Sequence, residues 1–407
     1  MKKIITVLIS SSILFSVDFI DKCGSHQHQV RNTRPNCDLY IDSPLGNFRV
    51  HYDASGFHSA TESYVQAVGE AADYSRDILV NIMGFLPEVD DADGIYDIYL
   101  QSHANGAYGY NAADCDHHTS GSYVCSGDEV AGASFIVIDK DFNYSCSDIS
   151  GLANFCVAEN SGIDAMKITI AHEFFHAIQR RYIDDASPNK SMENYCEDSY
   201  FFEFISTWFE DVAYPDINDY LNFAFPYLRT PELNISDYDP DQSSGTDAGY
   251  SLALFGHYLT KIYDGVDNEQ NSTIIKKILE QITGDYQGEA RDVIDYILIN
   301  EYSSTFAEAW ADFNARNVYN GEFSDAYNQI YYYEDQKHIN PILCSNSDCG
   351  SFWDADGIIS PLTYPVSSSL INQEGAVSIR SYQVEDLSFL DFMFNLNDPI
   401  QIIEEDF

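Results

Sequence analysis

The spacing of apolar residues changes near residue 161 of this chain, and that change restricts its fold more than any other feature. Up to about residue 160, apolar and polar residues alternate over short stretches, as they do in a half-buried β-strand. From about residue 161, apolar residues return at the roughly 3.6-residue spacing of an amphipathic helix. We therefore predict an α+β fold, with a mixed first half, a helical second half and a small β-rich tail.

The same patterns, together with capping residues, predict the individual elements. A capping box at Ser59 and Glu62 precedes a helix that should stop at Gly84. Residues 101–132 are rich in Gly, Ser, Asn, Asp and His and are predicted to form one long loop. The predicted strands cover 47–53, 95–100 and 134–139, and the later helices cover 162–183, 195–212, 249–263, 272–283, 288–300 and 304–317.

The charge of the chain is strongly unbalanced, because 65 Asp and Glu stand against 20 Lys and Arg, a formal net charge of −45. Nucleic acids and anionic membrane surfaces would be repelled by a field of this sign, so neither is an expected partner. Hydrophobic residues make up 45% of the chain, which is enough for a large core. The acidity therefore indicates the surface of a globular protein.

The N-terminus has the layout of a secretory signal, since Met1, Lys2 and Lys3 precede an apolar run. We assign residues 1–22 to a signal peptide, and an uncleaved membrane anchor is the alternative. No later segment reaches the roughly 18 apolar residues of a bilayer-spanning helix, so we expect a protein that is secreted, periplasmic or at the cell surface. The remaining chain divides into an α+β N-terminal lobe (38–160), catalytic helices with a helical lobe (161–340) and a β-rich C-terminal segment (341–407).

Nine cysteines fit an oxidising compartment. None of them lies in a Cys-x-x-Cys arrangement, so a thiolate zinc site is not expected. Proximity in sequence suggests disulfides that close short loops, pairing Cys115 with Cys125, Cys146 with Cys156, and Cys344 with Cys349.

The clearest chemical signal is the motif His172-Glu173-Phe-Phe-His176. On a helix, His172 and His176 project from one face within reach of a single ion, with Glu173 beside them. Neutral imidazoles suit zinc. No Pro or Gly interrupts residues 163–183, so the helix that this geometry requires is expected to form. The alternative is a core helix in which two histidines happen to stack.

A catalytic zinc site needs a third protein ligand and an open position. The metal helix should end about eight residues, or roughly 12 Å, beyond His176. A following helix that starts near Tyr195 and packs antiparallel must rise by about the same distance, which places Glu203 level with the metal. Glu197 would fall short, and Glu210 would overshoot by about 10 Å. Glu203 is therefore the predicted third ligand.

Other residues are candidates for supporting roles around this metal. Glu210 lies on the same helix face as Glu203 and could orient a ligating histidine through its free ring N–H; a solvated or ion-paired carboxylate is the alternative. Tyr250 begins a predicted helix after a Gly-containing loop and is our candidate donor to the substrate oxygen. His257 is a weaker candidate, because a histidine at such a position is more often part of the core. Tyr258 is also weaker, because it is one of 30 tyrosines in the chain.

Two acidic clusters, Asp90–Gly94 and Asp237–Asp241, have the alternating carboxylates that suit Ca²⁺. Neither matches the twelve-residue calcium loop, because Gln242 stands where Gly is needed and no glutamate closes the loop. Solvated loops are the preferred interpretation for a chain this acidic.

With His172, Glu173, His176 and Glu203 in place, the chain resembles the gluzincin metallopeptidases, the thermolysin-like group whose third zinc ligand is a glutamate. More narrowly, it is similar to a set of secreted bacterial zinc metallopeptidases over roughly residues 45–320. The matching segments are Asn47–Tyr52, Tyr96–Leu100, His172–Gln179, Thr207–Asp211 and Tyr214–Tyr220.

The resemblance implies a zincin-like two-lobed fold, with a mixed β-sheet over the metal helix and a helical lobe below it. It also implies that an extended substrate pairs with a sheet edge, for which 134–139 is the candidate; an interior core strand is the alternative. The sequence departs from the group at two positions, where Ser206 replaces an expected Ala and Tyr200 an expected Trp.

From the motif and the helix-length argument we predict an exported zinc-dependent endopeptidase that acts on protein or peptide substrates. In such a site a zinc-bound water attacks the carbonyl carbon, and Glu173 serves as general base and then as general acid. The alternative is a non-catalytic, zinc-stabilised surface, adhesion or binding protein. A purely structural zinc site would have no need for Glu173.

Overall fold

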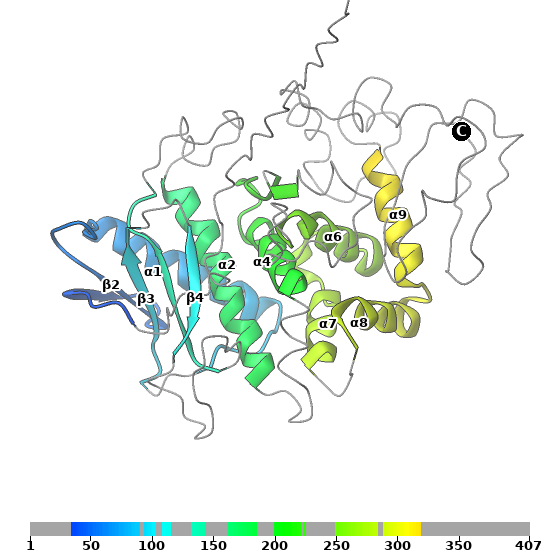
Figure 1. Ribbon diagram of the computed structural model, residues 1–407, viewed down its shortest axis with the longest axis horizontal. Coiled ribbons are helices and arrows are strands. Elements are labelled where there is room, and N and C mark those ends of the chain that lie inside the picture. The colour runs from blue at the N-terminus through cyan, green and yellow to red at the C-terminus, as the bar shows by residue number, and fades with distance from the viewer. Residues whose placement is uncertain are drawn as a thin grey trace, which may run out of the picture.

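The computed structural model describes residues 34–89, 93–102, 108–114, 132–142, 162–184, 199–221, 223–224, 249–283 and 288–318. Over these residues the chain forms a mixed five-stranded sheet and a set of helices, which confirms the predicted α+β class (Figure 1). The predicted signal peptide, the disulfide pairs, the acidic loop at 237–241 and the C-terminal segment lie outside the described residues.

The sheet has the strand order β1-β2-β3-β5-β4. Strands β2, β3 and β5 are parallel to one another, and β1 and β4 close the two edges in antiparallel pairing. The strands are β1 (Leu39–Asp42), β2 (Phe48–Tyr52), β3 (Tyr96–Gln101), β4 (Gly109–Ala113) and β5 (Ser134–Asp139).

Strand β4 corrects two expectations. It lies within residues 101–132, which were predicted to be one long loop, and it occupies the sheet edge. Strand β5, at 134–139, therefore lies in the interior of the sheet between β3 and β4, and the core-strand alternative is the right one for this segment.

One face of the sheet is apolar, and α1 and α2 pack on it (Figure 1). Helix α1 (Glu62–Arg76) continues through one π-helical turn (η2, Asp77–Ile82) and ends before Gly84, as predicted. Its N-cap is Thr61, whose hydroxyl accepts a hydrogen bond from the Tyr64 N–H at 3.3 Å. The predicted cap at Ser59 was therefore wrong, because Thr61 lies one residue before the first turn.

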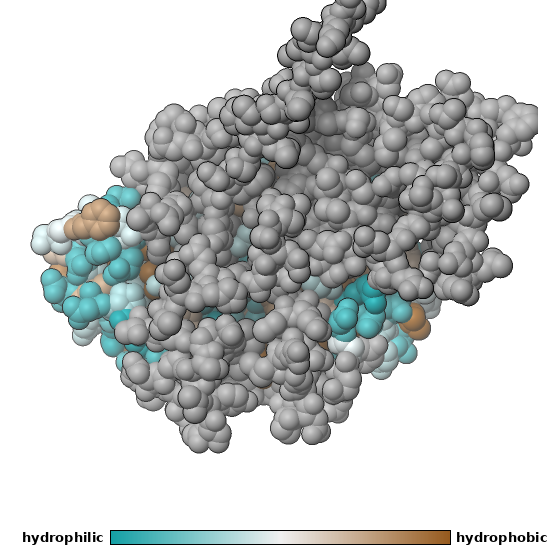
Figure 2. Space-filling view, viewed as in Figure 1, coloured by the Kyte–Doolittle hydropathy of each residue, from teal (hydrophilic) through white to brown (hydrophobic). Residues whose placement is uncertain are grey.

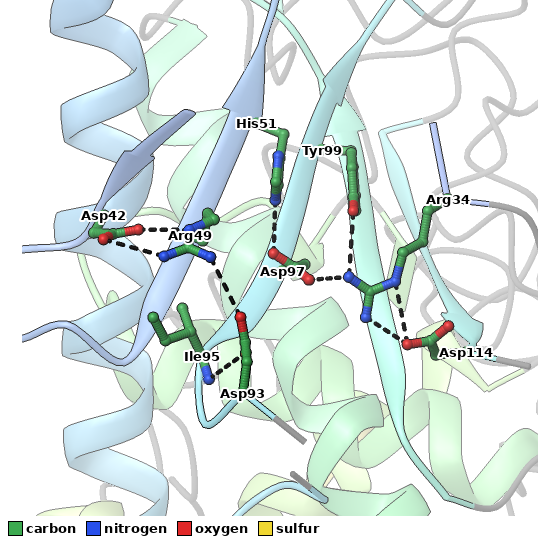
Figure 3. Close-up of polar contacts among 9 residues, drawn as sticks. All are labelled: Arg34, Asp42, Arg49, His51, Asp93, Ile95, Asp97, Tyr99 and Asp114. Carbon is green, nitrogen blue, oxygen red and sulfur yellow. Dashed lines mark hydrogen bonds and ion pairs between the residues drawn. The ribbon is translucent and has the colours of Figure 1, made fainter. Parts of the chain in front are cut away.

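The opposite face of the sheet carries a buried charged cluster, which we call the sheet cluster (Figure 3). The Arg34 guanidinium donates to the carboxylates of Asp97 on β3 and Asp114 beyond β4. His51 on β2 bonds to Asp97 through Nε2 at 2.6 Å, and its ring stacks on Tyr99 with centroids 4.5 Å apart. The sheet cluster thereby ties Arg34 to β2, to β3 and to the residue that follows β4.

A second arginine on this face, Arg49, holds two exposed carboxylates (Figure 3). It donates to Asp42 at 2.8 Å and to Asp93 at 3.3 Å. Asp93 also accepts the main-chain N–H of Ile95 at 3.0 Å. Asp93, from the acidic cluster at 90–94, therefore stabilises the turn that leads into β3.

The next helix is α2 (Gly162–Asp184), which packs against β4, β5, α1 and α4. Its bounds agree with the prediction of 162–183. In Figure 1 it lies between the sheet and the remaining helices. These are α4 (Ser199–Ala213), α6 (Ala253–Tyr258), α7 (Ile274–Thr283), α8 (Ala290–Ile297) and α9 (Phe306–Val318), with shorter turns at η6 (Tyr250–Leu252), η7 (Leu259–Asp264), η8 (Glu269–Asn271) and η9 (Leu298–Tyr302).

Where described residues reach the surface in Figure 2, at the sheet end and over α7 and α8, they are mostly hydrophilic, with single apolar side chains among them. Among the described helices, none has both the length and the apolar character that crossing a bilayer requires.

Candidate metal centre

Helices α2 and α4 form the centre of the site, and both are buried over most of their length. The buried residues of α2 include Phe174, Phe175 and Ile178, and those of α4 include Phe204 and Trp208. A polar side chain in such an interface loses its water and must find a partner within the protein or bind an ion. The contacts of the polar residues on the facing sides of α2 and α4 therefore indicate whether this interface could bind an ion.

Three of these residues converge. The Nε2 atoms of His172 and His176 lie 3.1 Å apart. The Glu203 carboxylate reaches both rings, with Oε2 at 3.1 Å from His172 Nε2 and Oε1 at 3.3 Å from His176 Nε2. One ligand atom from each residue lies within 4.8 Å of the others, and all three residues are buried. The structure therefore brings together the predicted ligand set on the antiparallel helix pair.

The outward ring nitrogens of both histidines are also held. Glu210 Oε1 lies 2.7 Å from His172 Nδ1, and Glu210 is only 1% exposed, so it is not the solvated carboxylate of the alternative interpretation. Gln179 Oε1 lies 2.7 Å from His176 Nδ1. The sequence analysis missed Gln179, since its only signal is a position one turn after His176. With each Nδ1 occupied in this way, each Nε2 is directed at the shared centre.

The electrostatics of His172 are dominated by its carboxylate neighbours. Burial disfavours its charged form, but hydrogen bonds to Glu203 and Glu210 outweigh that effect and raise the pKa of His172 to about 10. A proton on this ring and a metal ion at the same place would satisfy the same surroundings, because both are positive charges placed between carboxylates. Two imidazoles and one carboxylate are also a donor set that zinc accepts. The residues present therefore fit a metal ion.

Gly249 lets the chain approach this centre closely. Its φ is +86°, and a Cβ there would lie 2.5 Å from the Glu203 Cβ and 2.7 Å from the Tyr200 carbonyl oxygen. No other residue tolerates both conditions. The close approach places Tyr250, which is buried, with its ring centroid 5.9 Å from that of His172. The predicted oxyanion donor therefore lies beside the metal-binding residues.

The two weaker candidates lie away from the centre. His257 is buried and bonds through Nδ1 to Glu269 at 3.0 Å, with Asp211 at 3.6 Å from Nε2. Tyr258 donates its hydroxyl to Asp312 at 2.8 Å. His257 is therefore a core histidine, as its sequence position favoured.

Glu173 is fully buried on α2, and its main chain is tied to the sheet edge. Asn111 on β4 donates from Nδ2 to the Glu173 carbonyl oxygen at 3.2 Å, while its Oδ1 accepts from Arg180 Nε at 2.6 Å. Asn111 was also missed by the sequence analysis, because its strand was taken for a loop. It fixes the edge strand against the part of α2 that carries Glu173.

No protein-family model matches the chain, and none of the curated proteins does. The likeness to gluzincins drawn from the motifs therefore stays a prediction.

Proposed function

We propose that this protein is an exported zinc-dependent endopeptidase of the two-lobed gluzincin type. The observation that carries the proposal is the buried convergence of His172, His176 and Glu203, held from behind by Glu210 on His172. A histidine ligand whose other ring nitrogen is bonded to a carboxylate is the usual arrangement of a catalytic zinc site. The sheet and the helices beyond α2 correspond, in this proposal, to the two lobes.

Zinc is the proposed ion because of the donor types. Two neutral imidazoles and one carboxylate match the His₂Glu set of hydrolytic zinc enzymes. Magnesium and calcium prefer sites made of oxygen ligands, which the paired histidines oppose. Three protein ligands also leave one tetrahedral position for water or substrate.

The chemistry would be divided between the ion and two side chains. A zinc ion supplies Lewis acidity, which lowers the pKa of water to about 7 and polarises a carbonyl. The Glu173 carboxylate accepts a proton from the attacking water and delivers it to the nitrogen of the departing amine. The Tyr250 hydroxyl donates a hydrogen bond to the oxygen that gains negative charge. The net reaction is hydrolysis of one peptide bond.

An extended substrate would bind along β4. The resemblance requires a sheet edge near the metal helix, and β4 is the edge strand that packs on α2 and is bonded to Glu173 through Asn111. This replaces the earlier candidate, β5, whose two neighbours occupy both of its sides. A strand added to an edge is recognised mainly through its main chain, so β4 would contribute affinity more than side-chain preference.

The test is cleavage of a denatured-protein digest by zinc-loaded protein, followed by mass spectrometry, with Glu173→Ala in parallel. We expect the wild type to cleave and Glu173→Ala to bind one zinc per chain without cleaving, because it lacks only the group that moves the proton. Cleavage by Glu173→Ala at the wild-type rate would contradict the proposed mechanism.

A second candidate function is a zinc-stabilised protein without catalysis. The burial of all three metal-binding residues and of Glu173 favours it, because structural zinc sites are closed to solvent. The same experiment separates the two. Stoichiometric zinc in a wild type that cleaves nothing would support the second function.

A further inference from the structure

We propose that Gln179 is a positioning residue that orients His176 and sets the spacing between the two metal-binding helices. The inference rests on the metal binding of the proposed function. It goes beyond the metal-binding motif itself, because Gln179 contributes no ligand atom to the cluster.

The Gln179 side chain is buried, and each of its polar atoms is engaged. Its Oε1 lies 2.7 Å from His176 Nδ1. Its Nε2 lies 2.9 Å from the Phe202 carbonyl oxygen and 2.9 Å from Ser206 Oγ. An amide nitrogen has two hydrogens to donate, so these two acceptors account for both of them.

The Phe202 carbonyl fixes which way round the amide lies. A main-chain carbonyl only accepts hydrogen bonds, so the nitrogen of the Gln179 amide must face it. Its oxygen must then face His176, and because that oxygen only accepts, His176 must donate from Nδ1. The remaining lone pair of the ring is on Nε2, 3.1 Å from His172 Nε2. The amide therefore selects the ring form of His176 that can bind a metal.

The same amide joins the two helices beside the ligands. Gln179 follows His176 by three residues on α2, and its acceptors Phe202 and Ser206 lie on either side of Glu203 in the sequence of α4. A shift of α4 along α2 would break the bond to Phe202 and displace Glu203 together with it. One side chain thus sets the separation between the His176 ring and the Glu203 carboxylate.

The two histidines are supported in different ways. His172 is held by a carboxylate from α4, Glu210, and His176 by a neutral amide from its own helix. A carboxylate at position 179 would add a further buried negative charge and would meet the Phe202 carbonyl oxygen without a proton to donate. A neutral side chain that both accepts and donates is therefore required, and glutamine provides it.

The test is zinc affinity, measured by competition with a chromophoric chelator, for Gln179→Ala, Gln179→Glu and a matched control. The control is Gln270→Ala, because Gln270 also donates its amide to a carbonyl of α4, that of Val212 at 3.1 Å, without touching a histidine. We expect Gln179→Ala to weaken zinc binding by about 10- to 100-fold and Gln270→Ala to leave it unchanged. Gln179→Glu keeps the side-chain volume and should also weaken binding.

A second readout reports the orientation of His176 directly. In zinc-loaded protein with ¹⁵N-labelled histidine, the Nδ1–H of His176 should be hydrogen-bonded and slow to exchange, and this protection should be lost in Gln179→Ala. Wild-type affinity and protection in both Gln179 variants would overturn the inference and leave the proposed function standing. A wild type that binds no zinc would overturn both.

Discussion

Two buried clusters in this protein combine carboxylates with cationic or titratable partners, and they differ in the partner. In the sheet cluster, Asp97 and Asp114 bond to Arg34, and Asp97 also bonds to His51. In the metal cluster, Glu203 and Glu210 bond to the rings of His172 and His176. Both clusters are largely removed from water, so the difference in partner decides what each can do.

An arginine stays protonated in proteins and has no lone pair for a metal, so Arg34 is a permanent cation between Asp97 and Asp114. A histidine can lose its proton and offer the freed nitrogen to a metal ion. The carboxylates of the metal cluster can therefore exchange a proton for an external cation without a change in the fold. A permanent cation such as Arg34, more than the degree of burial, therefore separates a structural charge cluster from a binding site.

The largest expected effect is the loss of metal binding in His172→Ala. This change removes the ring that contacts Glu203, Glu210 and His176, so only two of the three donors remain. We expect no stoichiometric zinc after dialysis, measured by atomic emission. An Arg34→Met variant, which alters only the sheet cluster, should retain one zinc per chain. A loss of zinc in Arg34→Met would show that the clusters are not independent.

The Arg34→Met variant should instead lose stability. It leaves Asp97 and Asp114 buried without their arginine, and breaking a buried pair in this way costs about 3–5 kcal/mol. The measurement is the free energy of unfolding from a denaturant titration.

Arg49→Met is the matched control for this loss. Arg49 pairs with carboxylates that are 45% and 55% exposed, so its removal should change the free energy of unfolding by about 1 kcal/mol or less. Equal effects of the two substitutions would contradict the expected difference between an arginine with buried carboxylate partners and one with exposed partners.

A smaller effect is expected for Glu210→Gln. The amide can still accept a hydrogen bond from His172 Nδ1, but it lacks the negative charge that favours a cation at the centre. We expect zinc affinity to fall by about 10- to 100-fold in chelator competition. An unchanged affinity would mean that the hydrogen bond alone supports His172, and that the charge of Glu210 serves another purpose.

The sequence was sufficient for the parts of the structure that local patterns control. The metal helix and strand β5 were predicted with accurate bounds, because no Pro or Gly interrupts the helix and the strand is a short run of β-branched and aromatic residues. Glu203 could be found because two antiparallel helices of known rise leave little freedom in height. For this reason the three residues that converge in the structure are the predicted set.

The parts that were missed depend on tertiary contacts. Strand β4 reads Gly-Tyr-Asn-Ala-Ala, without alternation, and it is a strand because β5 and α2 lie beside it. Asn111 and Gln179 carry amides whose role is set by their partners on other elements. The sheet cluster was not foreseen either, since Arg34 and Asp97 are far apart in sequence.

A third buried histidine, His257, also lies among carboxylates, and it makes the free energy of unfolding depend on pH. His257 faces Glu269 on η8, Asp211 on α4, Lys261 on η7 and the ring of Tyr220. Burial lowers its pKa, but the charges of Glu269 and Asp211 outweigh this, and the pKa of His257 is raised above the usual 6.5. Among the described residues, only His172, His176 and Glu203 form a group that could hold a metal ion, so the carboxylates around His257 favour a proton on its ring.

Because the folded protein holds this proton more tightly than the unfolded chain, the stabilisation is complete below about pH 6.5 and is lost as the pH rises through the folded-state pKa. We expect the free energy of unfolding of the wild type to fall more steeply above neutral pH than that of His257→Gln, by at most about 1.4 kcal/mol per pH unit. Denaturant titrations of both proteins across pH 6 to 10 measure the difference. Taking the difference removes the contribution of His172, which titrates in both proteins, and parallel curves would show that His257 is neutral in the folded state.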